Sequence, residues 1–238
     1  MKEPVILLYL LLSMTLIRAQ SGWEVGVFAG LAAYSGDVNP TLTSRFKDFT
    51  PSIGLTTRTN LSKRFGFRVG LTYLKLKGDD EHYESRESRD FNFNTNLVEL
   101  GVVGEWEPFG ANRFFTDAEG KINMDKLISP YLFAGVGLMG GGLNTDFSNY
   151  PGKNEQIIAG IKKDRAYGNS LLSVSLPIGL GLKFDLSEKF TLAVEGSIRG
   201  SFTDYLDGIS FSASPGAKDI YMNMGIVVYR RFGNPGAE

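Results

Sequence analysis

Residues 170–201 read SLLSVSLPIGLGLKFDLSEKFTLAVEGSIRGS, and this stretch decides the fold. Every second residue from Leu172 to Phe184 is apolar, with serine, proline, glycine and lysine between them. After the sequence LSEK the alternation resumes from Phe190 to Ile198. A period of two indicates β-strands with one apolar and one polar face. Each run is about twice the usual 5–6 residues of a strand, and strands of about 9–11 residues cross a bilayer. The stretch therefore predicts a transmembrane β-hairpin with its apolar face toward lipid.

The same alternation recurs along the rest of the chain. The predicted strands are residues 22–34, 51–61, 65–73, 95–107, 130–140, 172–184, 190–198 and 220–228. The sequence thus predicts an all-β fold, an eight-stranded antiparallel transmembrane up-and-down β-barrel.

The connections between the predicted strands alternate in length. Those after the second and sixth strands are tight turns, and those after the first, third, fifth and seventh are long. Outer-membrane barrels have short periplasmic turns and long outer loops, so both chain termini are expected in the periplasm. The connection at residues 108–127 breaks this alternation, because it is long where a tight turn is expected.

The N-terminus has the pattern of an export signal. One lysine precedes an apolar run from Val5 to Ile17, which is too short for a membrane-spanning helix, and Ala19 suits the cleavage site. We expect residues 1–19 to be a signal peptide and 20–238 to be one barrel domain in the outer membrane of a Gram-negative bacterium. The alternative is a retained membrane anchor.

Composition limits the chemistry that this chain can perform. It has no cysteine, which excludes disulfides and thiolate metal sites. The net charge of −1 offers no general attraction for nucleic acid. We expect outer-membrane lipid as a partner, and no cofactor, metal, nucleic acid or small-molecule substrate.

Charged residues collect on the face predicted to line the barrel. They are Glu24, Arg58, Arg68, Glu99, Glu105, Lys183, Glu195 and Arg199. The interior of an eight-stranded barrel is just wide enough for side chains to fill it, and unpaired charge there is costly. We therefore expect a hydrogen-bonded polar plug; an ion or proton path is the alternative.

Two other features allow a functional and a structural interpretation. His82 lies in the charged segment DDEHYES and could act with Ser85 or Ser88 in catalysis, while the acidic residues of this segment could bind a divalent cation. We expect a solvated loop instead, and no enzymatic activity. Aromatic residues near strand ends are predicted to form interfacial girdles; they are Trp23, Tyr73, Trp106, Tyr229 and Phe232.

The exceptional connection at residues 108–127 mixes apolar and charged side chains. Its candidate docking residues are Phe109, Arg113, Phe114, Phe115, Ile122 and Met124. Aromatic residues and arginine are common anchors of protein interfaces. We expect this segment to dock a periplasmic protein; the alternative is an insertion that contacts nothing.

Several short segments occur together in a familiar order. They are EVGVFAG from Glu24, YSGDVNP from Tyr34, GDD from Gly78, PYLFAGVG from Pro130 and YRRF from Tyr229. The set resembles the PorG-like family of small outer-membrane barrels from Bacteroidetes, which includes the outer-membrane component of the type IX secretion system. The resemblance implies a non-enzymatic barrel that anchors or positions secretion machinery, with a periplasmic ring of a lipoprotein and its partner as neighbours. A passive structural or surface-binding barrel that acts through its long outer loops is the alternative function.

Overall fold

The computed structural model describes residues 22–39, 46–83, 89–110, 114–116, 118–119, 121–124, 128–213, 216 and 218–232. The expected signal peptide lies outside the described residues, as do Ser85, Ser88 and Arg113. For residues 114–116 and 122–124 the description is limited to the backbone.

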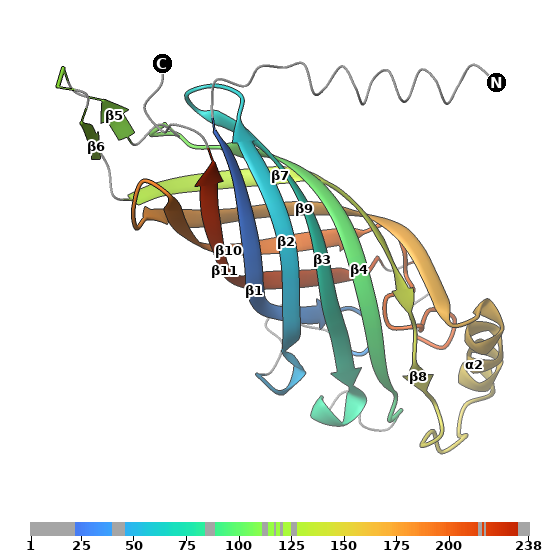
Figure 1. Ribbon diagram of the computed structural model, residues 1–238. Helices are drawn as coiled ribbons and strands as arrows, with labels where there is room; N and C mark the ends of the chain where they lie inside the picture. The colour runs from blue at the N-terminus through green and yellow to red at the C-terminus, as the bar shows by residue number, and fades with distance from the viewer. Residues whose placement is uncertain are drawn as a thin grey trace, which may run out of the picture.

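The chain forms a closed antiparallel β-barrel (Figure 1). Its wall consists of β1 (Trp23–Ser35), β2 (Thr50–Asn60), β3 (Phe65–Asp79), β4 (Asn92–Trp106), β7 (Ile128–Gly142), β9 (Ser170–Asp185), β10 (Phe190–Ser201) and β11 (Ile220–Phe232). Each wall strand pairs with its neighbours in the chain, and β1 pairs with β11 to close the sheet. The predicted up-and-down architecture is confirmed.

The two ends of the barrel differ. One end, here the turn end, carries the tight connections at residues 61–64 and 186–189 together with the start of β1 and the end of β11. The long connection between β4 and β7 also lies at this end. The other, the loop end, carries the connections after β1, β3, β7 and β10, which include η1 (Phe46–Asp48), η2 (Asp80–His82) and α2 (Glu155–Tyr167). Figure 1 shows α2 at the opposite end of the barrel from the first residues of β1.

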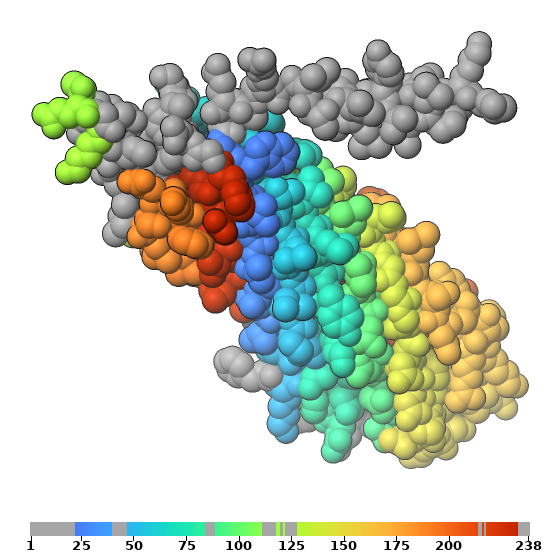
Figure 2. Space-filling model, viewed as in Figure 1, coloured from blue at the N-terminus to red at the C-terminus, as the bar shows by residue number. Residues whose placement is uncertain are grey.

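The outer face of the wall carries an apolar belt, and Figure 2 shows this wall as a continuous surface in the view drawn. Exposed aliphatic side chains come from every wall strand; they include Val27, Leu55, Leu71, Leu100, Val136, Ile178, Val194 and Ile226. Water would make such a surface an aggregation site, whereas a bilayer core would cover it. The alternate residues that the sequence predicts to face lipid are therefore the ones whose side chains are exposed on the outer wall.

Aromatic side chains border the belt at the turn end. The exposed ones are Trp23, Phe65, Trp106, Phe190 and Phe232. Tyr73 is exposed toward the loop end. The prediction that Tyr229 belongs to a girdle is wrong: its side chain is fully buried inside the barrel. Tyr229 has the inward parity of β11, and its hydroxyl accepts a hydrogen bond from Arg68 there.

The polarity of the wall reverses toward the loop end. The outward positions of β3 and β4 carry Lys75, Lys77, Asn94 and Asn96 there, and the inward ones Leu74, Leu76, Phe93 and Leu97. This arrangement of apolar interior and polar exterior is that of a water-soluble barrel. It explains why β3 and β4, with 15 residues each, run further than predicted. They continue past the belt into water.

A folded cap covers the loop end. The segment 202–213, here called the loop-end plug, inserts the fully buried side chains of Leu206 and Ile209 into an apolar cluster. α2 packs beside it: the Asp164 carboxylate accepts hydrogen bonds from the backbone N–H groups of Phe211 and Ser212. The sequence predicts long outer loops for both segments, and residues 202–218 are rich in serine, glycine and aspartate. The structure shows them closing the barrel instead.

Two short strands, β5 (Phe114–Thr116) and β6 (Ile122–Met124), form a separate hairpin. Figure 1 shows this hairpin standing away from the wall at the turn end. Within the described part of the chain, no helix has the length and apolar character needed to cross a membrane.

Candidate functional site

A buried ionic cluster fills the turn end of the barrel, and Glu105 is at its centre. Glu105 lies 3.0 Å from the Arg68 guanidinium, 3.4 Å from that of Arg58 and 2.6 Å from the Lys183 ammonium group. Arg58 and Arg68 are directly opposite one another on β2 and β3. Like charges in this position repel. The Glu105 carboxylate forms an ion pair with each of the two guanidinium groups, and this attraction offsets the repulsion between them.

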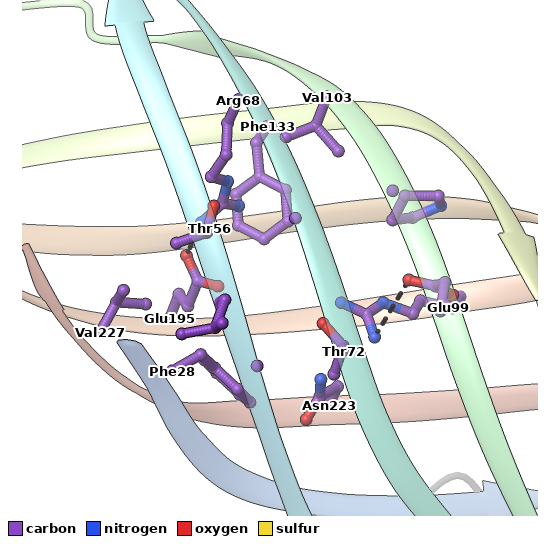
Figure 3. A pocket seen from close by; sticks show the side chains of 16 residues that line it. Phe28, Thr56, Arg68, Thr72, Glu99, Val103, Phe133, Glu195, Asn223 and Val227 are labelled. Carbon is purple, nitrogen blue, oxygen red and sulfur yellow. Dashed lines mark hydrogen bonds and ion pairs between the residues drawn. The ribbon is translucent and has the colours of Figure 1, made fainter. Parts of the chain in front are cut away.

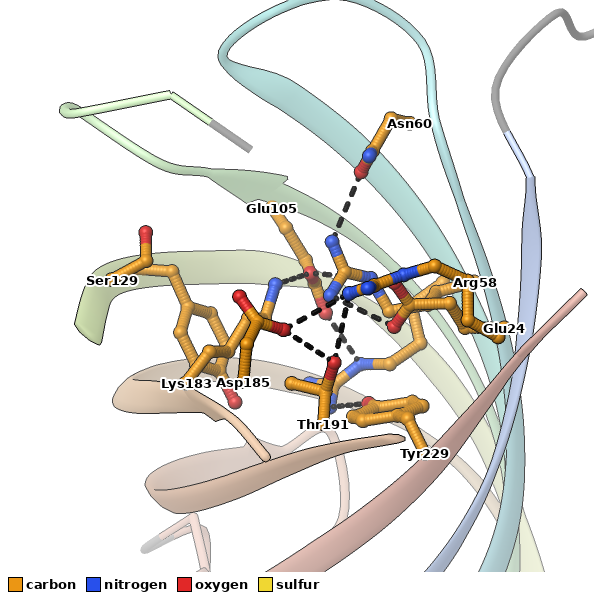
Figure 4. Close-up of polar contacts among 12 residues, drawn as sticks. Glu24, Arg58, Asn60, Glu105, Ser129, Lys183, Asp185, Thr191 and Tyr229 are labelled. Atoms are coloured by element: carbon orange, nitrogen blue, oxygen red, sulfur yellow. Dashed lines mark hydrogen bonds and ion pairs between the residues drawn. The ribbon is translucent and has the colours of Figure 1, made fainter. Parts of the chain in front are cut away.

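Further carboxylates complete the cluster around the same cations. Glu107 accepts hydrogen bonds from Lys183 at 2.7 Å and from Arg58 at 2.9 Å. Glu24 pairs with Arg58 at 3.4 Å and, across the closing β1–β11 ladder, with Arg231 at 3.1 Å. Figure 4 shows side chains from several strands converging on this point. The ionic cluster therefore ties the closing strands of the barrel together.

Aromatic rings support the cluster from the middle of the barrel. The Arg68 guanidinium lies 4.7 Å above the Phe133 ring and the Lys183 ammonium group 4.1 Å above the Tyr131 ring. The Tyr131 hydroxyl donates a hydrogen bond to Glu195, which also pairs with Arg68 at 2.6 Å. The aromatic faces and the paired carboxylates together compensate these cations for the loss of their hydration.

A small cavity lies between this cluster and a second polar group (Figure 3). Arg68 and Glu195 line one side, and Glu99 and Arg199, an ion pair at 3.4 Å, line the other. The Glu99 carboxylate also accepts hydrogen bonds from Ser175 and Tyr221. The cavity has a volume of about 50 Å³, room for a few water molecules. It is a pocket within the lumen, not a channel through it.

The lumen is therefore closed at two levels. At the turn end, Arg58, Glu105 and Lys183 are almost completely buried and joined by ion pairs. At the loop end, Leu206 and Ile209 fill the mouth with apolar side chains. An ion would have to break the first barrier and lose its hydration in the second. This arrangement can stabilise a barrel and hold its ends in place, but it offers no path for a solute.

The structure places all eight predicted interior charges in the lumen, in the ionic cluster or beside the cavity. Sequence reasoning missed Glu107, Asp185 and Arg231, which pair with other members of the cluster. Each continues the inward parity of its strand by one more step at the turn end. Following the alternation to the last residue of each strand, and one residue beyond in the case of Glu107, would have found them.

His82 has a structural partner at the loop end. Its Nδ1 lies 2.8 Å from the Asp48 carboxylate, which also accepts a hydrogen bond from the Tyr83 hydroxyl. In the same segment, both carboxylate oxygens of Asp80 accept hydrogen bonds from Arg89. These contacts connect two loop-end connections. The residues that the structure describes contain no cluster of three or more metal-ligating side chains.

The candidate docking residues are distributed around the separate hairpin. Phe109 is 62% exposed just before it. Phe114 pairs with Met124 across β5 and β6, Phe115 lies opposite Asn123, and Ile122 lies opposite Thr116. The hairpin backbone thus brings the predicted apolar residues together on one short ribbon, and Arg113 lies outside the described residues.

The closed wall, the apolar belt and the filled lumen define a small β-barrel of the outer-membrane class. The chain belongs to the family described as "Domain of unknown function (DUF6089)", whose model matches residues 2–233. No curated protein sequence matches the chain at a significant level.

Solved structures that are similar to the chain include outer-membrane proteins. Neisserial surface protein A (NspA) is 13% identical, with a TM-score of 0.50 over 88% of this chain and 97% of that chain. The Ail protein of Yersinia pestis is 11% identical, with a TM-score of 0.44 over 89% of this chain and 99% of that chain. OprG from Pseudomonas aeruginosa is 13% identical, with a TM-score of 0.43 over 90% of this chain and 96% of that chain. At this identity, the likeness to NspA shows a shared fold alone.

Proposed function

We propose that this protein is a non-enzymatic anchor in the outer membrane, which holds a periplasmic component of protein-secretion machinery through its turn end. The observation that carries the proposal is the lumen closed at two levels, beside a hairpin that stands free of the barrel. A barrel that cannot conduct a solute must act through its ends or its outer wall. The turn end offers the β5–β6 hairpin as its main projecting feature.

The shape of the two ends supports the proposed orientation. The wall extends past the apolar belt at the loop end, where its exterior becomes polar, and the tight turns lie at the other end. Outer-membrane barrels have their tight turns in the periplasm. In this orientation the residues at the start of β1, the end of β11 and the hairpin all face the periplasm. Type IX secretion is the system that the resemblance to PorG-like barrels suggests.

A second candidate function uses the opposite end. The loop end is a folded cap with a helix whose exposed face carries Lys162, Lys163 and Arg165. Such a preformed surface favours binding outside the cell. In this case the barrel would be a surface-binding protein, and the hairpin would be dispensable.

Replacing residues 112–126 with a short Gly-Ser turn tests the docking proposal. The barrel should remain folded and inserted, because no wall strand is shortened. Recovery of the periplasmic partner with the purified barrel and secretion of cargo should both fall by at least about tenfold, the loss expected when an interface anchor worth about 2 kcal/mol is removed. Co-purification and a secretion assay measure the two effects.

The matched control replaces α2, residues 154–168, with a Gly-Ser linker at the opposite end. We expect this variant to secrete cargo and retain the partner at the wild-type level. The docking proposal fails if the hairpin variant behaves like the wild type. A hairpin variant that keeps both activities would show that the hairpin is dispensable, as the surface-binding alternative requires.

A further inference from the structure

Three side chains meet in an unusual arrangement beneath the loop-end plug. The Tyr34 hydroxyl oxygen lies 2.6 Å from Asp207 Oδ2 and 2.6 Å from Asp219 Oδ1. It also accepts a hydrogen bond from the backbone N–H of Asp37 at 2.9 Å. All three side chains are almost completely buried.

The number of hydrogen atoms decides what this arrangement requires. A tyrosine hydroxyl has one hydrogen to donate, and an ionised carboxylate has none. The Tyr34 hydroxyl can therefore satisfy one of the two carboxylates. The second contact at 2.6 Å needs another hydrogen, which a protonated carboxyl group supplies by donating to the tyrosine oxygen. One proton is thus held between Asp207 and Asp219.

The other oxygens of the two carboxyl groups hold the plug itself. Asp207 Oδ1 accepts a hydrogen bond from the N–H of Ile209, and Asp219 Oδ2 accepts one from the N–H of Leu206. Leu206 and Ile209 are the two side chains that fill the mouth of the barrel. The carboxyl pair therefore connects the buried residues of the plug to Tyr34 at the end of β1.

The charged surroundings of the pair disfavour a second negative charge. Burial, with the carboxylates of Asp37 and Asp204, raises the pKa of Asp219 to about 7, although the hydrogen bonds from Tyr34 and Leu206 lower it. Burial, followed by the charge of Asp219, raises the pKa of Asp207 well above its usual 3.8.

The nearby cations are engaged elsewhere. The Arg89 guanidinium binds the Asp80 carboxylate and the Asp37 carbonyl oxygen, and the exposed Lys218 ammonium group donates to the carbonyl oxygen of Phe202. From the neighbouring β8 (Thr145–Asp146), the Thr145 hydroxyl contacts the carbonyl oxygen of Asp207, and the Asp146 carboxylate is exposed. Among the residues that the structure describes, the charged groups that raise the pKa of the pair are therefore carboxylates.

We propose that Asp207 and Asp219 form a proton-binding latch that fastens the loop-end plug over the mouth of the barrel. The closed plug binds a proton that the open plug releases. The latch stabilises the closed plug fully below pH of about 4, the ordinary pKa of aspartate, and this stabilisation is lost as the pH rises to about 7. Above that pH the plug opens more readily, so this end of the protein responds to the acidity of the medium.

Thiol labelling measures this opening directly, because the natural chain has no cysteine. The buried Ser210 in the plug is replaced with cysteine in one variant, and the exposed Ser148 in another. The labelling rate at position 210 is divided by that at position 148, which cancels the pH dependence of the thiol itself. In the purified, membrane-inserted protein, we expect this ratio to rise by at least about tenfold between pH 5 and pH 8.

Asp219→Asn in the same background decides whether the latch is responsible. An asparagine amide can donate to the Tyr34 oxygen while its carbonyl keeps the bond from Leu206, so the ratio should stay low and flat with pH. Asp207→Asn should do the same and serves if the first variant does not fold. Glu81→Gln, an exposed carboxylate on another loop-end connection, should leave the rise unchanged.

Two results would overturn the latch. One is a ratio that rises equally in the asparagine variants, which would place the titrating group elsewhere. The other is a plug that millimolar calcium keeps closed at pH 8, which would show that the carboxylates hold a cation rather than a proton.

Discussion

Lys183→Met is expected to lower the free energy of unfolding by about 3–5 kcal/mol, as the loss of one partner from a buried ion pair does. The Lys183 ammonium group is fully buried and donates to Glu105 at 2.6 Å and to Glu107 at 2.7 Å. Methionine keeps most of the volume but leaves both carboxylates without this cation. Urea unfolding from lipid vesicles, followed by heat-modifiable electrophoretic migration, measures the change.

Lys189→Met is the matched control, because Lys189 is exposed in the tight turn between β9 and β10. Its replacement should change the free energy of unfolding by less than about 0.5 kcal/mol. If Lys183→Met costs as little as Lys189→Met, the ionic cluster does not stabilise the turn end of the barrel as described above.

Ile178→Arg is expected to lower the free energy of unfolding from a bilayer by about 2–4 kcal/mol. Ile178 lies in the middle of β9, and its side chain is 66% exposed on the apolar belt. In water, such a position would tolerate arginine, whereas at the midplane of a bilayer the charge must leave water. The same vesicle unfolding assay measures the loss.

Leu186→Arg is the control for this substitution, because Leu186 is 63% exposed just beyond the end of β9. Near the membrane interface, the same change should cost about 0–1 kcal/mol. Equal costs at the two positions would show that the belt does not span a bilayer with its centre near Ile178.

The alternation of side chains predicted the fold because it assigns each residue of a strand to the inside or the outside of the barrel. Once these sides are assigned, an eight-stranded barrel allows few other arrangements of its strands. The parity of β9 and β10 alone separates the exposed Ile178 and Val194 from the buried Lys183 and Ala193. The same parity placed the interior charges in the lumen. The girdle prediction failed at Tyr229, because it gave the aromatic type near a strand end more weight than the inward parity, which was correct.

The cap at the loop end could not be predicted in the same way. Leu206 and Ile209 are buried, but they lie in a segment rich in serine, glycine and aspartate. Such a composition is typical of an exposed turn, so it gives no sign that these two side chains are buried. α2 follows a Pro-Gly pair and carries charges on most sides, so its sequence has little helical periodicity. Both segments are defined by tertiary contacts, such as the bonds from Phe211 and Ser212 to Asp164. A local sequence pattern does not reveal contacts of this range.

For the ionic cluster, the sequence predicts which residues face the lumen but not which of them form ion pairs. The inward positions of the charges follow from parity. The meeting of Glu105 with three cations, however, depends on the register of four strand pairs, β2–β3, β3–β4, β4–β7 and β7–β9. Register is set by turn lengths and by the closure of the barrel. The sequence could therefore name most members of the cluster without showing which of them bind one another.

A barrel whose lumen is closed at two levels should not conduct ions. Single-channel recording of the purified protein in planar bilayers tests it most directly, with an open porin as the positive control and heat-modifiable migration as proof of folding. We expect no conductance above that of the bare bilayer, because the ionic cluster and the loop-end plug both close the lumen. Stable, repeated conductance steps from the folded wild-type protein would contradict it.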